Sequence, residues 1–391
     1  MEILFLCGVF DHKNENEVIL NAKKPVEFSA NLFQKKIIRG LAKNNYSYKV
    51  VSAPFIGSYP NASKTMRFNG FKKEWQEYTY VHFNNLWGIR NFSRAKSLKS
   101  AIDSFIELND SQKIIIVYSP HTPFLDAAVY AKKKDARIKI CLIVPDLPQY
   151  MNLSQHKSLV YKIGKKYDIS KFNKLNKWVD SYMILTEYMK ESLAINERPY
   201  FVVEGLIDSD DLIENNFVSK KGDNIKFVYT GKLNVEFGLV KLVDAFMTLK
   251  GENYRLILCG DGDAVPYIKN KAKCDNRILY CGQVTPKEAY KKMVSADVLI
   301  NPRGAEGEYT KYSFPSKNID YLLTGNEVIG YKLPGIPNVY NSYMHFIEDD
   351  IVATILESLK NKKNQGFLKY AKQNLDNSVI TRKIVEMTIK E

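Results

Sequence analysis

The chain has 391 residues, which is more than one compact hydrophobic core usually holds, and so predicts about two domains. Its composition, with 45% hydrophobic and 12% aromatic residues, excludes a disordered, collagen-like or low-complexity protein. The formal charge is +14, and residues 1–200 carry 31 Lys and Arg against 18 Asp and Glu, whereas residues 201–391 carry 26 against 25. This asymmetry indicates an anionic partner for the first half, either a membrane surface, a nucleic acid or a phosphorylated substrate, unless it reflects only a lysine-rich proteome.

Several absent features bear on the compartment. No stretch approaches the roughly 20 apolar residues of a membrane-spanning helix. The N-terminal run MEILFLCGVFDH has neither the basic segment nor the cleavage site of a signal peptide. The five cysteines, at positions 7, 141, 259, 274 and 281, are odd in number and lack metal-site spacing. We therefore expect a reduced, cytoplasmic protein without a bound metal.

The first half of the chain alternates short apolar runs with segments of helical period. Apolar residues in these runs are consecutive, which is typical of strands buried on both faces of a parallel sheet. The runs are 2–8, 48–54, 113–120, 138–146 and 181–187. Strands that alternate with helices predict an α/β domain.

The pattern restarts near residue 200. The runs of the second half are 200–208, 225–233, 255–263, 277–284, 296–302 and 326–332. Most of them end in small polar residues, which is typical of the carboxyl edge of a doubly wound sheet, where ligands bind. We therefore expect two Rossmann-like doubly wound domains that face each other across a cleft.

The stretch 229–238, YTGKLNVEFG, leads from a predicted strand into a predicted helix. Gly231 permits close backbone approach, Lys232 supplies a positive charge, and Gly238 can open the helix. These features suit an anionic group such as a diphosphate, although an ordinary turn between strand and helix has the same pattern.

A second turn, Gly260-Asp261-Gly262, follows the next strand and also fits a turn without a ligand. Val284, at the end of the strand after that, can offer backbone groups to a base.

The stretch 300–331 has the strongest pattern. A strand ends in Asn-Pro, a loop with Glu306 and Glu308 follows, and Ser313-Phe314-Pro315-Ser316-Lys317 begins an amphipathic helix. The first amides of that helix, those of Ser316 and Lys317, are expected to point toward an anion. Asp320, one turn later, is placed to accept hydrogen bonds from ribose hydroxyls.

These three motifs, in this order over residues 225–332, resemble the nucleotide-sugar domain of glycosyltransferase family 4, which has the GT-B architecture. That family has a Gly-Arg/Lys-Leu turn, a Gly-x-Gly turn and a Glu-x7-Glu helix start. Here they stand as Gly231-Lys232-Leu233, the turn at Gly260, and the stretch from Tyr312 to Asp320. The SFPSK sequence resembles a branch that makes surface polysaccharides.

Three departures from the family pattern concern the site. Phe237 stands where a lysine is usual, Tyr312 replaces the first glutamate, and Pro145 replaces the family's catalytic-centre histidine. Glu306 or Glu308 can substitute for the missing glutamate. His121 and Asp146 follow neighbouring strands and can reach the cleft, although both also fit ordinary loop residues.

The resemblance implies transfer of a sugar from a nucleotide-diphosphate sugar, most often a UDP-sugar, to a lipid-linked or oligosaccharide acceptor. It further implies retention of anomeric configuration, no metal, an acceptor domain at 1–200 joined by a C-terminal helix at about 376–391, and a nucleotide-sugar domain at 201–375. The expected catalytic residues are Asp146, His121 and Glu308. The expected donor-binding residues are Gly8, Gly231, Lys232, Val284, Tyr312, Ser313, Phe314, Ser316, Lys317 and Asp320. A non-catalytic partner subunit and a nucleotide-sugar epimerase remain alternatives.

The basic half holds two charged clusters. Residues 157–178 contain seven lysines and one aspartate, with apolar residues at helical spacing. This stretch fits a helix on an anionic membrane surface, and equally a solvated helix that packs its apolar side on the domain. Arg90, Arg94, Lys96 and Lys99 lie among aromatic residues, but no nucleic-acid-binding motif accompanies them, so no nucleic-acid partner is expected.

Overall fold

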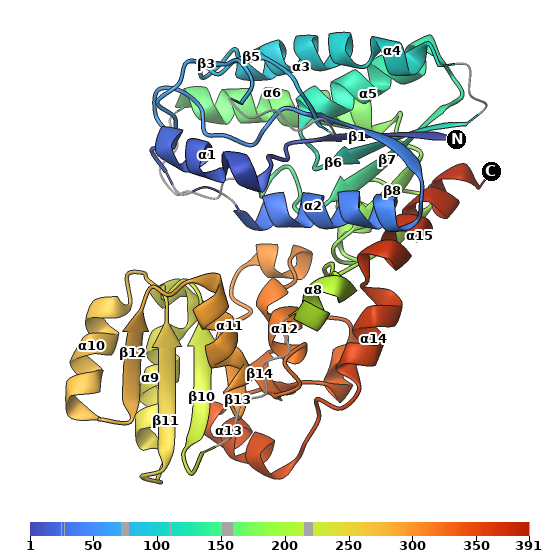
Figure 1. The fold of residues 1–391 in the computed structure, drawn as a ribbon. Coiled ribbons are helices and arrows are strands. Elements are labelled where there is room, and N and C mark those ends of the chain that lie inside the picture. Colours follow the sequence, from blue (N-terminus) through green and yellow to red (C-terminus); the bar gives the residue numbers. More distant parts are fainter. Residues whose placement is uncertain are drawn as a thin grey trace. The chain divides into compact units, whose positions relative to one another are not determined.

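A computed structural model of the chain describes residues 1–24, 26, 28–71, 78–108, 112–150, 159–214 and 222–390. The chain divides into two compact units, residues 1–208 with 375–391 and residues 209–374 (Figure 1). Each unit has its own parallel β-sheet with helices packed on it. The predicted α/β fold with two parallel-sheet domains is therefore confirmed.

The first unit is built on a seven-stranded sheet with the order β4-β2-β1-β6-β7-β8-β9, in which every neighbouring pair is parallel. The strands are β1 (Glu2–Cys7), β2 (Ser47–Ser52), β4 (Tyr78–Tyr80), β6 (Lys113–Tyr118), β7 (Ile138–Val144), β8 (Ser181–Ile184) and β9 (Tyr200–Val202). All six residues of β6 are buried, as the consecutive apolar residues predict for a central parallel strand. A separate antiparallel pair joins β3 (Arg67–Phe68) to β5 (Phe83–Asn84).

Helices cover both faces of this sheet, with α2 and α15 on one face and α3, α5 and α6 on the other (Figure 1). The helices are α1 (Glu15–Asn21), α2 (Phe28–Lys43), α3 (Arg90–Ala101), α4 (Asp103–Ile106), α5 (Thr122–Lys134), α6 (Leu159–Asn176), α7 (Met189–Ser192) and α15 (Asn377–Ile389), with a 3-10 turn η1 (His12–Asn14). The C-terminal helix α15 packs on α2, where the Asn44 amide donates a hydrogen bond to the Ser378 carbonyl at 2.7 Å.

The strand at residues 200–202 belongs to the first unit, whereas we assigned the run 200–208 to the second. Strand β9 pairs with β8, and Asp208 then forms ion pairs with Arg39 (3.1 Å) and Lys43 (2.6 Å) of α2. These contacts hold the chain to the first sheet as far as Asp208, so the boundary of the first unit lies after that residue.

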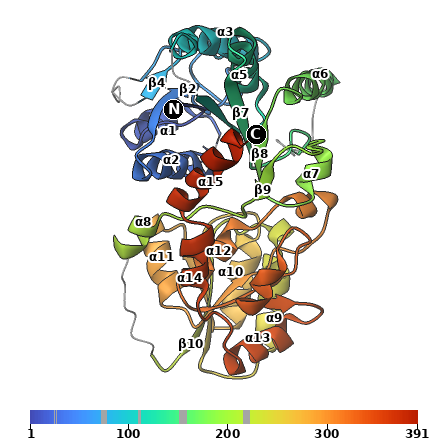
Figure 2. The same ribbon diagram turned by 90° about the vertical axis from the view of Figure 1, so that its right-hand side faces the viewer.

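The second unit has a six-stranded sheet with the order β12-β11-β10-β13-β14-β15, again parallel throughout. The strands are β10 (Ile225–Thr230), β11 (Tyr254–Cys259), β12 (Ile278–Gly282), β13 (Val298–Asn301), β14 (Glu327–Tyr331) and β15 (His345–Ile347). The helices are α8 (Ser209–Glu214), α9 (Leu239–Thr248), α10 (Val265–Cys274), α11 (Pro286–Val294), α12 (Ser316–Leu322), α13 (Ile351–Lys360) and α14 (Phe367–Asn374), with 3-10 turns η2 (Val235–Phe237), η3 (Glu308–Tyr312) and η4 (Asn338–Ser342). Figure 2 shows the same elements from the side.

Helix α9 shows why this unit folds. Leu239, Leu242, Val243 and Phe246 recur at the helical period, are all fully buried, and join one core cluster with residues of the neighbouring strands. At roughly 1.5–3 kcal/mol for each large apolar side chain, their burial is a main source of stability for this layer.

Two members of the basic cluster of α3, Arg90 and Arg94, are directed into the fold. Arg94 is 2% exposed, donates a hydrogen bond to the Pro54 carbonyl at 2.6 Å and lies over the Phe83 ring at 4.3 Å. Arg90 donates to the Ile56 carbonyl at 3.1 Å. These two arginines therefore hold the loop after β2 in place.

Candidate functional site

In both sheets the strand order reverses at one position. The reversal lies between β1 and β6 in the first sheet and between β10 and β13 in the second. Ligands of doubly wound folds bind outside the carboxyl ends of the two strands at such a switch point. The residues that follow these four strands are therefore the candidates for a ligand site.

Gly231 directly follows β10. Because it has no side chain, the space beside its Cα is open to the side chain of Lys317. Its φ of +139° is a conformation that side-chain-bearing residues rarely adopt, and the Lys317 ammonium lies 2.5 Å from where a Cβ on Gly231 would be. The same ammonium lies 5.8 Å from the centre of the Tyr229 ring. The predicted pair Gly231 and Lys317 is thus brought together at the switch point.

Arg303 follows β13, on the other side of the switch point. Its guanidinium lies 5.5 Å from the centre of the Phe237 ring and 5.8 Å from that of Tyr309. Its Nε is buried and has no hydrogen-bond partner among the residues that the structure describes. The charge of Arg303 also reaches Tyr229, where it opposes the rise that burial causes in the pKa of that hydroxyl. Lys317 thus lies against Tyr229, and Arg303 lies beside Phe237, in the loop that follows the same strand β10.

The positive charge of these two residues is not neutralised within the described parts of the chain. Neither side chain forms an ion pair with a carboxylate there. Burial lowers the pKa of Lys317, and the charge of Asp320, one turn further along α12, opposes that shift only in part. Two cations at one switch point without a carboxylate partner favour a ligand with two negative charges.

Sequence reasoning missed Arg303. The available signal was its position directly after a strand end, in Asn-Pro-Arg-Gly. That signal acquires meaning only once β13 is known to lie beside β10, because these strands are not consecutive in the chain.

The glycine of the second turn is needed for the same close packing. Gly260 has a φ of +139°, and a Cβ at this position would overlap the Gly231 carbonyl oxygen. The Gly231 amide donates to the Cys259 carbonyl and the Gly260 amide to the Gly282 carbonyl, both at 2.8 Å. The ends of β10, β11 and β12 are thereby locked together.

Replacing Gly231 by alanine is expected to lower the free energy of unfolding by about 1–2 kcal/mol, because the backbone conformation is strained for any residue with a Cβ. The Lys317 side chain must also move aside. Urea denaturation followed by circular dichroism measures this loss. Gly222→Ala, in an open loop position with an ordinary φ, is the matched control and is expected to change stability by less than about 0.5 kcal/mol.

The other predicted donor residues lie in different environments. Lys232, Ser316 and Asp320 are exposed, Val284 and Tyr312 are half-buried, and the Ser313 hydroxyl donates to the Thr310 carbonyl at 3.4 Å. Phe314 is buried, with its ring 5.0 Å from that of Tyr340, so it anchors the loop. A hydrogen bond of 2.7 Å between the side-chain amides of Asn301 and Asn318 fixes α12 against the end of β13.

The two candidate substitutes for the missing glutamate both bind lysines. Glu308 forms an exposed ion pair with Lys311 at 3.0 Å, and Glu306 forms one with Lys241 at 3.0 Å. The described residues bring together no group of three His, Cys, Asp or Glu side chains that could hold a metal ion.

In the first unit, Gly8, His121 and Asp146 follow three neighbouring strands, β1, β6 and β7. The Gly8 amide donates to the Gln34 side chain at 2.7 Å, and the Phe55 ring occupies the space beside its Cα. The His121 ring lies 5.1 Å from the Phe55 ring, and Asp146 is exposed. The topology thus places all three predicted residues at one sheet edge.

His121 is uncharged at neutral pH. Burial, reinforced by the positive charges of Arg94 and Arg90, lowers its pKa to about 3. A histidine with this pKa is a neutral imidazole near pH 7, which accepts a hydrogen bond at one nitrogen and donates one from the other but does not act as a general acid.

The low pKa of His121 predicts a pH-dependent stability. Because the unfolded chain binds this proton near pH 6.5 and the folded chain only near pH 3, stability is full above pH 6.5 and falls as the pH drops toward 3. His121→Gln should therefore show a smaller fall in Tm between pH 7 and 4.5 than the wild type. The exposed His82 offers the control, since His82→Gln should keep the wild-type slope. Equal slopes for all three proteins would contradict the prediction.

An acid–base pair also lies in the loop after β1, where sequence reasoning assigned nothing. Asp11 is buried, and one carboxylate oxygen lies 2.6 Å from the His12 Nδ1, while the other has no hydrogen-bond partner. A carboxylate that orients an imidazole is a common arrangement for proton transfer. An Asp-His dipeptide shortly after an apolar strand was the available signal.

No protein-family model and no curated protein matches the sequence significantly. The structure, in contrast, matches solved glycosyltransferase structures along its whole length. The lipopolysaccharide outer core galactosyltransferase WaaB, in its apo form, is 12% identical with a TM-score of 0.63, and the match covers 99% of each chain. The fold is that of a GT-B glycosyltransferase.

Two further matches agree on this GT-B fold. Sucrose-phosphate synthase from Thermosynechococcus elongatus is 11% identical with a TM-score of 0.61, over 99% of this chain and 98% of that one. HepE from Anabaena, solved in complex with UDP, is 14% identical with a TM-score of 0.57, over 99% of both chains. At these identities the likeness establishes the fold and leaves the activity to be argued from the residues.

Proposed function

We propose that this chain is a glycosyltransferase that moves a sugar from a nucleotide-diphosphate sugar, in our view a UDP-sugar, to an acceptor hydroxyl. The observation that carries the proposal is the position of two cations at the switch point of the second sheet: Lys317 lies against Tyr229 of β10, and Arg303 follows β13 and lies beside Phe237. A diphosphate supplies the two negative charges that this arrangement favours. The GT-B fold, and UDP bound to HepE, support the choice of ligand.

In the proposed reaction, the bond from the anomeric carbon to the diphosphate oxygen breaks and a bond to the acceptor oxygen forms on the same face. Lys317, Arg303 and the exposed Lys232 stabilise the departing diphosphate, which takes up the proton of the acceptor hydroxyl. Their three positive charges do the work that a metal ion would otherwise do. Asp146 orients the acceptor hydroxyl, with His121 and Glu308 as further catalytic candidates.

The remaining donor contacts follow the predicted motifs. We assign the base to backbone groups near Val284, the ribose to Asp320, and the phosphates also to the first amides of α12, those of Ser316 and Lys317. Gly8, Tyr312, Ser313 and Phe314 complete the proposed donor site, with Phe314 acting by anchoring the loop. The sugar itself and the acceptor linkage are chosen by loop contacts outside this set.

For the acceptor we propose a lipid-linked or oligosaccharide chain of surface polysaccharide synthesis, in the cytoplasm. This rests on the resemblance of residues 225–332 to glycosyltransferase family 4 and of the SFPSK sequence to its polysaccharide branch. The structure pairs none of the five cysteines, which fits a reducing compartment.

Calorimetric titration with UDP, GDP and their sugar conjugates tests the donor site, and radiolabelled sugar transfer to membrane lipid extracts tests the reaction. Binding of one nucleotide with transfer supports the proposal. Binding without transfer favours the non-catalytic partner subunit, and sugar interconversion without an acceptor favours the epimerase. If no nucleoside diphosphate binds, both enzyme readings are wrong.

A further inference from the structure

One side of helix α6, its inner side, packs against the rest of the first unit. Phe172 is buried, the Asn176 amide donates to the Leu193 carbonyl at 2.7 Å, and Asp168 accepts a hydrogen bond from the Thr122 hydroxyl at 2.5 Å. These contacts fix the orientation of the helix, so its opposite side faces outward.

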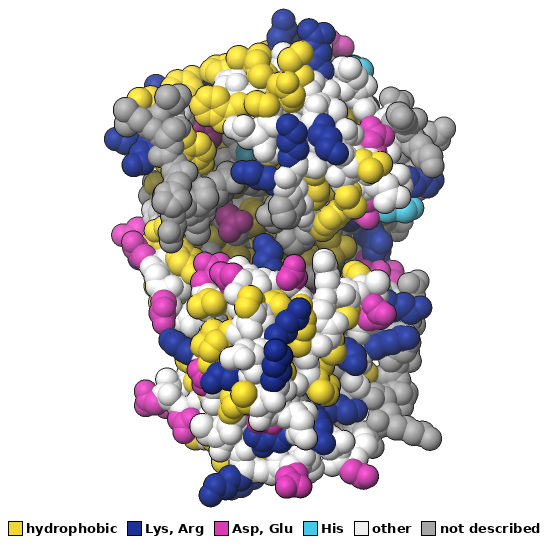
Figure 3. Space-filling view, turned by 90° about the vertical axis from the view of Figure 1, so that its left-hand side faces the viewer, with side chains coloured by type: hydrophobic (Ala, Val, Ile, Leu, Met, Phe, Trp, Pro, Cys, Tyr) yellow, Lys and Arg dark blue, Asp and Glu magenta, His cyan; other side chains and the backbone are white. Residues whose placement is uncertain are grey.

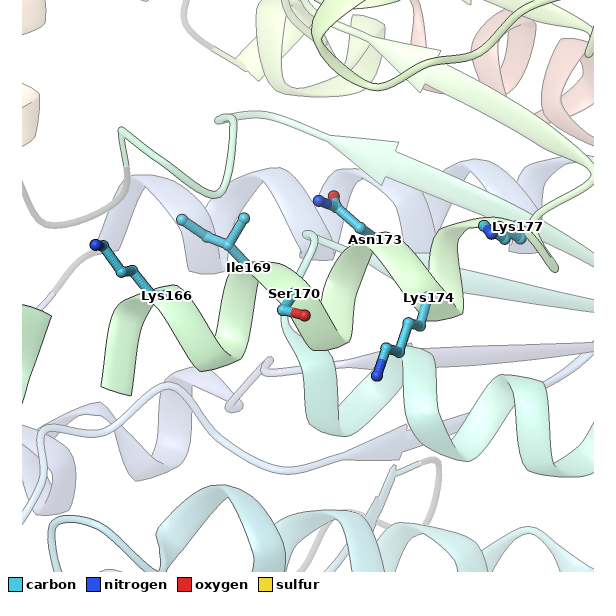
Figure 4. A pocket seen from close by; sticks show the side chains of 6 residues that line it. All are labelled: Lys166, Ile169, Ser170, Asn173, Lys174 and Lys177. Atoms are coloured by element: carbon cyan, nitrogen blue, oxygen red, sulfur yellow. The ribbon is translucent and has the colours of Figure 1, made fainter. Parts of the chain in front are cut away.

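The outward side of α6 has a row of lysines. Lys166, Lys174 and Lys177, with Ser170 and Asn173 between them, line an open depression of about 380 Å³ (Figure 4). Ser170, Asn173 and Lys174 lie four, seven and eight residues after Lys166, which places them on one face of α6, and Lys177 directly follows the last residue of the helix. The depression is shallow and wide, which suits phosphate groups arrayed on a surface better than one enclosed ligand.

These three lysines form no ion pair that would stabilise the described part of the first unit. Within the described residues none of them pairs with a carboxylate. Lys171, on the flank of the same helix, behaves differently, because it binds Asp126 at 2.8 Å together with Lys99 at 3.0 Å. One lysine of α6 is therefore structural, and the row of three is positive charge without a partner in the described chain.

Apolar side chains lie next to the lysine row. Ile163 and Tyr167, four residues apart at the N-terminal end of the row, are 61% and 57% exposed. Phe92, at the start of α3, is 58% exposed and lies 5.9 Å from the Lys171 ammonium, so it borders α6. Figure 3 shows hydrophobic side chains gathered on the surface of the first unit.

The predicted amphipathic stretch 157–178 thus divides into two parts. Its later apolar residues, Phe172 and Leu175, lie on the inner side or half-buried, whereas Ile163 and Tyr167 face outward with the lysines. Residues 157 and 158 lie outside the described chain. The two interpretations of this stretch therefore apply to different sides of one helix.

We propose that the outward face of α6, with Phe92 beside it, docks the protein on an anionic phospholipid bilayer. Lysines at the level of the headgroups with aliphatic and aromatic side chains at the acyl boundary are the composition of an interfacial helix. Among the described residues no helix has the length and apolar character to span a membrane. Docking through lysines at the headgroups is electrostatic, so we expect salt to reverse it. This inference goes beyond the proposed function and does not depend on the nucleotide site.

The test is co-sedimentation of the full chain with phosphatidylcholine vesicles that contain or lack phosphatidylglycerol. Wild-type protein should bind only the anionic vesicles, and Lys166→Gln/Lys174→Gln/Lys177→Gln should bind them about 100-fold more weakly, at roughly fivefold for each lysine. The matched control, Lys250→Gln/Lys273→Gln/Lys287→Gln, removes the same charge from exposed lysines of the second unit and should bind like the wild type. Ile163→Ser/Tyr167→Ser should weaken binding at constant charge.

Three results would overturn the inference: indifference to phosphatidylglycerol, equal losses in both triple variants, or displacement from vesicles by millimolar inorganic phosphate, which would indicate a small-anion site. UDP titration of the same variants separates this inference from the proposed function. Unchanged UDP affinity in the α6 variant, with lost vesicle binding, supports docking alone. Vesicle binding by a protein that binds no nucleotide would overturn only the proposed function.

Discussion

Lys317→Met is expected to weaken UDP binding by about 10- to 100-fold, because the variant loses a charge-assisted contact worth roughly 1.5–3 kcal/mol. Methionine keeps the apolar stem that lies against Gly231 and Tyr229, so the packing of the site is retained. Calorimetry measures the affinity. The stability of the free protein should not fall, since burial already disfavours the charged ammonium, as its lowered pKa shows.

The ligand series locates the Lys317 contact. If the ammonium binds the diphosphate, Lys317→Met should reduce UDP affinity far more than uridine affinity. Lys311→Met, in the 3-10 turn η3 that precedes α12 and paired with Glu308, serves as control and should bind UDP as the wild type does. Wild-type UDP affinity in Lys317→Met would show that the switch point of the second sheet is not the diphosphate site.

Much of the fold follows from the apolar pattern, because a strand buried on both faces leaves a distinctive run of consecutive residues. Strand β6 is an example, with all six residues buried. The assignment of residues 200–202 failed for a physical reason: a three-residue edge strand has too few side chains to indicate which sheet it joins. Its pairing with β8 and the ion pairs of Asp208 with α2, all long-range contacts, decide the matter.

The site was predictable where it depends on local chemistry. Gly231 and Lys317 were chosen because a turn after a strand and a lysine in the first turn of a helix have recognisable local signals, and the structure brings them together. Phe314, chosen on the same motif, packs inside against Tyr340. Arg303 has no local signal of comparable strength, because its position depends on the reversal of strand order.

The second large effect concerns Arg303 and Phe237. Arg303→Met should weaken UDP binding by about 10- to 100-fold, for the same charge-assisted contact that Lys317 supplies. Phe237 stands where the resembled family has a lysine, and in this chain its ring lies under the Arg303 guanidinium. We propose that Arg303 supplies here the cation that the resembled family has at position 237, and that the Phe237 ring supports it. Phe237→Leu, which removes this support, should cost about two- to fivefold.

A lysine placed at position 237, where the resembled family has one, tests whether Arg303 takes over the role of that lysine. In the Arg303→Met background, Phe237→Lys should recover most of the lost UDP affinity, whereas in the wild-type background it should add little, since two cations would compete for the same space. The resulting double-mutant cycle should show a coupling of about 1–2 kcal/mol. Additive effects of the two substitutions would show instead that residues 237 and 303 act on different parts of the ligand. A coupled result makes Arg303 and Phe237 one functional unit, in which an aromatic ring and a remote arginine do the work of one local lysine.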